Sequence, residues 1–154
     1  IPHISTGVML REHVENETEL GLVAKEILNK GNLVSDELVT SMLIERLEND
    51  DCEKGAILDG FPRTIAQAES LNIEGLNIKT VILFEVNETE LIKRMVERGR
   101  EDDTEESIKV RLDVYRDETL PLIKFYDDKD VLKTVDAFGD IDEIFNHISG
   151  LIKT

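Results

Sequence analysis

The sequence predicts an α/β fold with a mainly parallel sheet and helices on both faces. Three short apolar runs, at 55–59, 79–86 and 131–135, are typical of strands, and segments of helical period separate them. Residues 81–84 are continuously apolar, as expected of a strand that is covered on both faces. Strands that alternate with helices favour parallel pairing, in which ligands bind at the carboxyl ends of the strands.

The helical segments carry start and stop signals. Ser35 is expected to cap a helix with acidic residues in its first turn. Asn87, with Glu90 three residues later, resembles a capping box, and Gly99 should end that helix. A long helical pattern in the second half meets Pro121, where we expect a kink or a break. The last helical pattern is predicted to dock on the core through Ile141, Ile144, Phe145, Ile148, Leu151 and Ile152.

Composition indicates a single folded unit. The 154 residues are 40% hydrophobic and 34% charged, with no repeat and no low-complexity tract. No apolar run approaches the roughly 20 residues of a bilayer span, and no secretory signal is recognisable, so we expect no membrane partner. The lone Cys52 cannot form an internal disulfide, which favours a cytoplasmic location.

The charge balance bears on the class of ligand. A net charge of −16, from 34 acidic and 18 basic residues, argues against a nucleic-acid partner. Several arginines nevertheless lie beside turns or glycines. Local arginines on an acidic background suit a small polyphosphate ligand better than a long polyanion.

The most informative motif follows the first predicted strand. Residues 58–64 read Leu-Asp-Gly-Phe-Pro-Arg-Thr, and Gln67 follows three residues later. Gly60 lets the backbone approach a ligand, Pro62 stiffens the turn, and Arg63 offers a planar fork that matches phosphate. The amide of Gln67 can pair with the edge of a purine. Taken alone, the motif is also compatible with an ordinary strand-to-helix turn and a solvated arginine.

The motif resembles the signature of nucleoside-monophosphate kinases, in the form typical of adenylate kinases. The related UMP/CMP kinases usually have Asn in place of Thr64. Residues 4–11 and 31–36 resemble the start and the end of the AMP-binding segment of that family, and residues 135–139 resemble its turn near the adenine of ATP. The arginines of residues 94–111 match those around its lid. The resemblance covers essentially the whole chain.

The resemblance implies reversible phosphoryl transfer between ATP and AMP, which gives two ADP, by a monomer. Mg²⁺ would be bound through the nucleotide phosphates and water, with Asp59 helping to order that water. The AMP site would consist of Thr6, Arg11, Asn32, Leu33, Val34, Gly60, Phe61, Pro62, Arg63, Gln67, Arg100 and Arg111. ATP would be bound by Arg94, Arg98 and Gly139. The catalytic side chains on the transferring phosphates would be Arg94, Arg98, Arg100 and Arg111. The Phe61–Pro62 bond is expected to be cis.

The resemblance also implies two inserts in the core, an AMP-binding region at about 5–34 and a short lid without zinc at about 97–107. Two arginines flank Gly99 in this lid, so a mobile segment could bring both toward phosphate. Asp102 and Asp103 are expected to hold the side chains of these two arginines, Arg98 and Arg100, when the nucleotide is absent. A solvated charge cluster on a loop is the alternative for these residues.

Two features depart from the family pattern. Family members begin with a strand, a Gly-rich loop that ends in Gly-Lys, and a helix, whereas no Gly-x-x-x-x-Gly-Lys occurs in these 154 residues. We therefore expect 1–154 to be one kinase core that lacks its N-terminal strand and P-loop, with neighbouring strands left unpaired. Val8 stands where an acidic residue usually meets water around Mg²⁺, which predicts weaker coupling to Mg²⁺.

Three other functions remain open. A catalytically silent AMP-binding fragment is one alternative, because the phosphate-binding loop is absent from the sequence. An acidic interaction domain is another, and it should show no saturable AMP binding. A kinase of the UMP/CMP type is the third, although Thr64 and Gln67 argue against it.

Overall fold

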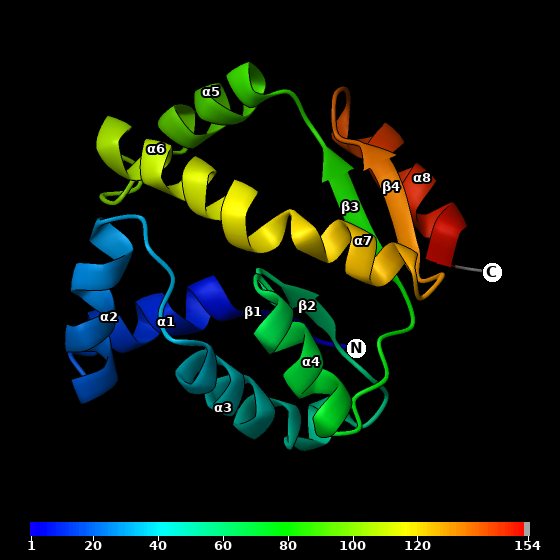
Figure 1. Cartoon of the computed structure of the whole chain (residues 1–154), viewed down its shortest axis with the longest axis horizontal. Helices are drawn as coiled ribbons and strands as arrows, with labels where there is room; N and C mark the ends of the chain where they lie inside the picture. The colour runs from blue at the N-terminus through cyan, green and yellow to red at the C-terminus, as the bar shows by residue number, and fades with distance from the viewer. Residues whose placement is uncertain (153–154) are drawn as a thin grey trace.

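The computed structural model describes residues 1–152, and Figure 1 shows how their helices surround short parallel strands. The first half of the chain consists of β1 (His3–Ser5), α1 (Thr6–Glu15), α2 (Glu19–Asn29), α3 (Asp36–Leu47), the short helix η1 (Asp50–Cys52), β2 (Ile57–Asp59) and α4 (Ile65–Ile73). The second half consists of β3 (Val81–Glu85), α5 (Glu88–Arg98), α6 (Glu105–Val114), the π-helix η2 (Tyr115–Thr119), α7 (Pro121–Asp127), β4 (Leu132–Asp136) and α8 (Ile141–Ile152).

The strands form two separate parallel pairs. β1 pairs with β2, so that Ser5 lies beside Asp59, and β3 pairs with β4, so that Glu85 lies beside Asp136. The predicted α/β class with parallel strands is confirmed, but within residues 1–152 the strands do not form the single sheet that we expected. The sequence also gave no sign of β1, because three residues are too few to show an alternating pattern.

The larger core fixes the first pair of strands against the helices that follow them. Ile4 of β1, Leu43 of α3 and Leu71 of α4 are buried together in one cluster. A smaller cluster around Leu122 and Tyr126 joins α4 to α7. In Figure 1, α1 to α4 gather around β1 and β2, while α7 lies in front of β3 and β4 and α8 lies behind them. The carboxyl ends of β1 and β2 are therefore held by packed elements on several sides.

The expected helix signals are confirmed in part. Gly99 ends α5 in the left-handed conformation, with φ 65°. Asn87 accepts a hydrogen bond from the backbone N–H of Glu90 at 2.8 Å, but the Glu90 carboxylate binds Arg94 instead of closing a capping box. The prediction for Ser35 was wrong in its mechanism, because Ser35 occupies the N-cap position of α3 without a side-chain cap bond.

The break expected at Pro121 is present as a wide turn of π-helix that precedes the proline. The π-helix η2 joins α6 to α7, and Leu120 N–H donates to the Tyr115 carbonyl at 2.8 Å. Pro121, which has no N–H to donate, then opens α7. The hydroxyl of Thr119 donates to the Arg63 carbonyl at 2.7 Å, so this wide turn also contacts the loop after β2.

Helix α8 docks with only half of its apolar stripe. Ile144, Ile148 and Leu151 are half-buried, whereas Ile141 is 82% exposed and Phe145 is 66% exposed. The prediction that all six apolar residues dock was therefore wrong for Ile141, Phe145 and Ile152. None of the helices in residues 1–152 has the length and apolar character needed to span a bilayer.

The contact between α1 and α2 gives a test of the fold. A Cβ added to Gly21 would lie 1.9 Å from the His13 carbonyl oxygen, so Gly21→Ala must push two helix backbones apart. We expect it to lower the free energy of unfolding by about 1–3 kcal/mol. Gly150→Ala is the matched control, because the added Cβ would meet nothing within 4 Å among the described residues. It should be neutral or stabilise α8 by up to about 1 kcal/mol. Equal urea midpoints for the two variants would contradict this packing.

Candidate functional site

The loop after β2 folds back onto the start of α1. The Thr6 hydroxyl, which is buried, donates to the Gly60 carbonyl at 3.0 Å. Gly60 has φ 73°, and a Cβ there would lie 2.9 Å from Nη2 of Arg63 and 3.4 Å from Oγ1 of Thr6. Glycine is therefore required for both its backbone conformation and the close approach of the Thr6 and Arg63 side chains. The Phe61–Pro62 bond is cis, as expected.

Arg63 presents unused donors at the carboxyl ends of β1 and β2. Its Nε donates to the Gly60 carbonyl at 2.8 Å, and its two terminal nitrogens donate no hydrogen bond to any described residue. Burial lowers the pKa of the Arg63 guanidinium, the nearby charges of Arg111 and Arg11 lower it further, and Asp59 opposes the shift. Arginine stays charged despite such shifts. Arg63 is solvent-exposed, so an oxyanion can reach its unused planar donors.

Further arginines converge on the same place from different elements. Arg11 comes from α1, and its terminal nitrogens lie 3.4 Å from the position of a Cβ on Gly7. Desolvation lowers the pKa of Arg100, and the charges of Arg11 and Arg98 lower it further. The structure thus brings together four arginines that are far apart in sequence. We call them the arginine cluster: Arg11, Arg63, Arg100 and Arg111.

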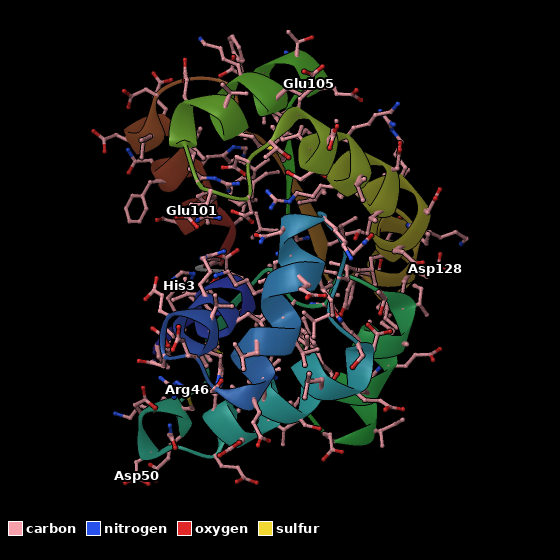
Figure 2. All side chains as sticks on the ribbon, turned by 90° about the vertical axis from the view of Figure 1, so that its left-hand side faces the viewer. His3, Arg46, Asp50, Glu101, Glu105 and Asp128 are labelled. Atoms are coloured by element: carbon pink, nitrogen blue, oxygen red, sulfur yellow. The ribbon has the colours of Figure 1, made fainter. Side chains whose placement is uncertain are left out.

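Asp103 holds two arginines between α5 and α6. Arg98 donates to its carboxylate through Nε at 2.9 Å and Nη2 at 2.6 Å, and Nη1 of Arg111 donates at 2.7 Å. Nη2 of Arg111 also binds the Asp102 carboxylate. The Asp103 side chain is 1% exposed, so the alternative of a solvated cluster was wrong for this residue. The expected hold is confirmed for Arg98 but not for Arg100, of which only the backbone N–H donates to Asp103, and Arg111 is held instead. In Figure 2, the turn at Glu101 and the start of β1 at His3 lie toward the same side of the molecule.

The buried position of Asp103 affects its ionisation. Burial alone would raise the pKa of this carboxyl. The hydrogen bonds from Arg98 and Arg111 outweigh burial, so the pKa of Asp103 lies below its usual range. The hydrogen bonds from Arg98 and Arg111 therefore stabilise the charged form of Asp103.

Arg94 lies apart from the arginine cluster and contacts the turn after β4. Its Nε donates to Glu90 at 2.8 Å, and its Nη2 donates to the Ala137 carbonyl at 3.1 Å. Gly139 belongs to the same turn, with φ 129°. A hollow of about 660 Å³ opens beside this turn at the carboxyl ends of β3 and β4. Its lining includes Phe84, Asn87, Tyr115, Leu120, Asp136 and Phe138.

Gln67 sits in a buried hydrogen-bond network on α4. It is 2% exposed, its Oε1 accepts from Arg63 N–H at 2.7 Å, and its Nε2 donates to Asp36 at 2.8 Å. The Thr64 hydroxyl donates to the other oxygen of Asp36 at 3.0 Å. From the sequence, Asp36 was expected only in the first turn of a helix and at the end of the segment 31–36, with no side-chain partner. No local pattern shows that its partners lie about 30 residues further along the chain.

The segment 31–34 joins α2 to α3 beside the arginine cluster. Gly31 has φ 79°, and a Cβ there would lie 2.5 Å from the Ser107 carbonyl oxygen. Val34 is buried, Leu33 is half-buried and Asn32 is exposed. This connection therefore contacts α6, the helix that carries Arg111.

The end of β2 carries a carboxylate near the arginine cluster. Asp59 Oδ2 lies 3.2 Å from Nε2 of His3, and both side chains are 61% exposed. Val8 is exposed and lines a hollow of about 180 Å³ beside His3. Within residues 1–152, no group of three or more His, Cys, Asp or Glu side chains is arranged to hold a metal ion.

Comparison with known proteins gives consistent matches. The sequence model of the adenylate kinase family matches residues 1–131. An adenylate kinase of Mycobacterium sp. (strain MCS) is 48% identical over 149 residues, which cover 94% of this chain and 81% of that protein. One from Mycobacteroides abscessus is 47% identical over 97% of this chain and 83% of its own length. One from Mycolicibacterium paratuberculosis is 49% identical over 94% of this chain and 81% of its own length.

The ionisation of Asp103 predicts a pH-dependent stability difference. Because the native pKa of Asp103 is lowered, its stabilising effect is complete above about pH 4, near the unfolded value of aspartate, and is lost as the pH falls through the native pKa. Asp103→Asn should lower the free energy of unfolding at pH 7 by about 1–3 kcal/mol, because it removes hydrogen bonds to charged groups.

Urea unfolding of both proteins between pH 7 and pH 2.5 measures this difference. We expect the gap between wild type and Asp103→Asn to close at the acid end. A gap that stays constant across this range would show that the Asp103 charge contributes nothing.

Proposed function

Because the chain belongs to the adenylate kinase family, we propose that it transfers the γ-phosphoryl group of ATP reversibly to AMP, which gives two ADP. The observation that carries this proposal is the convergence of Arg11, Arg63, Arg100 and Arg111 beside Gly60. Like charges repel one another, so such a cluster is favourable only with an anion of matching charge. Phosphoryl transfer requires positioning and charge neutralisation rather than covalent chemistry from the protein.

AMP is proposed to bind at the carboxyl ends of β1 and β2. Its phosphate would meet the unused terminal nitrogens of Arg63, with Arg11 on the opposite side. The loop of Gly60, Phe61 and Pro62 would pack along the nucleotide, together with Thr6 and the backbone of residues 32–34. Only an edge of the buried Gln67 amide would be available to the base.

The phosphates of ATP are proposed to approach from the side of α5. Arg94 and Gly139 flank the turn after β4, next to the hollow at β3. Arg98, Arg100 and Arg111 lie between the two proposed nucleotide sites. Arg98 and Arg111 are bound to Asp103 in this structure, so phosphate oxygens would replace carboxylate oxygens as their partners. This exchange preserves charge pairing throughout, which keeps its cost low.

We propose that these movements belong to two inserts in one kinase core that extends over 1–154. The AMP-binding region at about 5–34 contains α1 and α2, and the short lid at about 97–107 contains the turn between α5 and α6. Gly99 has a left-handed backbone and no close neighbour that would obstruct a change in this turn.

Adenylate kinases use Mg²⁺ together with their nucleotides, and the described residues fit an ion that is held by phosphates and water. Asp59 is exposed beside the arginine cluster and would order such water. A bound Mg²⁺ would supply positive charge to the phosphates of ATP. Asp59 can contribute acceptor oxygens only, and Val8 contributes none.

The direct test is a coupled assay for ADP formation from ATP and AMP with Mg²⁺, together with calorimetry of AMP alone. We expect saturable AMP binding, turnover with AMP, and much weaker turnover with UMP or CMP. AMP binding without turnover would support the silent fragment instead. A preference for UMP or CMP would overturn the proposed substrate, and absence of any nucleotide binding would overturn the site.

Arg63 gives a prediction for the phosphate of AMP. Arg63→Lys keeps the charge but removes the planar fork, so we expect the affinity for AMP to fall about 10- to 100-fold while the KM for ATP changes little. Arg116→Lys is the matched control, because Arg116 binds Glu88 and Asp113. It should leave both constants within about twofold, since exposed ion pairs contribute about 0–1 kcal/mol. Unchanged AMP affinity in Arg63→Lys would place the phosphate elsewhere.

A further inference from the structure

We propose that Asp36 is a positioning residue, which fixes the orientation of the Gln67 amide and thereby sets the preference for a 6-amino purine over a 6-oxo purine. This inference rests on the proposed function, in which Gln67 faces the base of AMP. Asp36 itself touches no nucleotide in this account. It acts from the first turn of α3 on a side chain of α4.

The contacts of Asp36 are complementary to those of its partners. Its Oδ1 accepts from Nε2 of Gln67 at 2.8 Å, and its Oδ2 accepts from the Thr64 hydroxyl at 3.0 Å. Thr64 in turn accepts from the backbone N–H of Gln67 at 3.1 Å as the N-cap of α4. Both oxygens of one carboxylate therefore hold the residue that caps α4 and the side chain that projects from its first turn.

These contacts determine the orientation of the Gln67 side-chain amide. A carboxylate can only accept a hydrogen bond, so the group that faces Asp36 must be the NH₂ of Gln67. The backbone N–H of Arg63 can only donate, so the group that faces it at 2.7 Å must be the carbonyl oxygen. A reversed amide would place oxygen against oxygen and hydrogen against hydrogen. Asp36 and Arg63 N–H together allow one orientation.

The oriented Gln67 amide retains one hydrogen-bond donor and one acceptor for a ligand. Among residues 1–152, one N–H of Nε2 and one lone pair of Oε1 have no partner. Adenine presents a donor at its 6-amino group and an acceptor at N1, and this pair matches an amide of fixed orientation. A 6-oxo purine presents an acceptor and a donor in the reverse order, so it requires the reversed amide. Fixing the amide therefore selects between the two bases.

The test compares binding of AMP and of IMP, which carries a 6-oxo purine, by calorimetry on the full chain. Wild type should bind AMP more tightly. Asp36→Ala removes the acceptor, so we expect the ratio of the two affinities to shrink about tenfold, the factor for one lost hydrogen bond. Asp36→Asn should keep most of the ratio, because its oxygen can still accept from Gln67 while its NH₂ donates to Thr64.

Three controls separate positioning from a general structural effect. Glu37→Ala removes the neighbouring charge from the same helix start and should leave the ratio unchanged. Asp36→Ala should change nothing further in a Gln67→Ala background, because the two residues act through one contact. If Asp36→Ala does not fold, Asp36→Ser removes the same contact with a residue that suits a helix start.

The outcomes distinguish this inference from the proposed function. Tight AMP binding by wild type with an unchanged ratio in Asp36→Ala overturns the role of Asp36 alone. If the ratio of AMP to IMP affinity falls equally in Asp36→Ala and Asp36→Asn, the role of Asp36 is also overturned, because the negative charge at the start of α3 would then be the cause. Absence of saturable AMP binding by wild type overturns the proposed function, and this inference with it.

Discussion

The arginine cluster imposes the main electrostatic constraint on this fold. Arg11, Arg63, Arg100 and Arg111 come from separate segments of the chain. Desolvation and the charges of Arg111 and Arg11 lower the pKa of Arg63, and desolvation and the charge of Arg11 lower the pKa of Arg100. Without an anion, such a group favours separation of the elements that carry it. The structure offsets this repulsion locally: Asp103 and Asp102 bind Arg111, and Asp59 lies near Arg63. The carboxylates around the cluster therefore stabilise the ligand-free state.

The backbone that surrounds the cluster has little freedom to relax. Gly60 brings its carbonyl within reach of both Thr6 and Arg63, and Gly31 brings the connection before α3 against the backbone of α6. Thr119 of η2 holds the carbonyl of Arg63 from a third direction. These contacts join the loop after β2 to elements from both halves of the chain. A nucleotide that binds there would meet side chains whose positions are largely fixed before it arrives, which reduces the ordering that binding requires.

The sequence predicted those parts of the site that depend on local chemistry. The motif from Asp59 to Gln67 indicated a turn built for phosphate, and the acidic pair beside Arg100 indicated partners for arginine. What it could not predict depends on tertiary packing. The division of the strands into two pairs and the half of the α8 stripe that stays exposed both depend on which elements become neighbours in the fold. The side-chain partners of His3 and Asp36 could not be predicted, because they lie 56 and about 30 residues away.

Asp36 and Asp103 make similar hydrogen-bond contacts but have different roles in the proposed site. Each carboxylate accepts side-chain hydrogen bonds from two other residues and holds them together. The partners of Asp36 are a hydroxyl and an amide that belong to one helix start, and no ligand group is available to replace the carboxylate there. The partners of Asp103 are two guanidinium groups, for which a phosphate is an equivalent partner. The first arrangement therefore fixes a geometry, whereas the second can be exchanged when a nucleotide enters. In the proposed site, the rigid contact of Asp36 with Gln67 distinguishes the base, and the arginines released from Asp103 bind the phosphates.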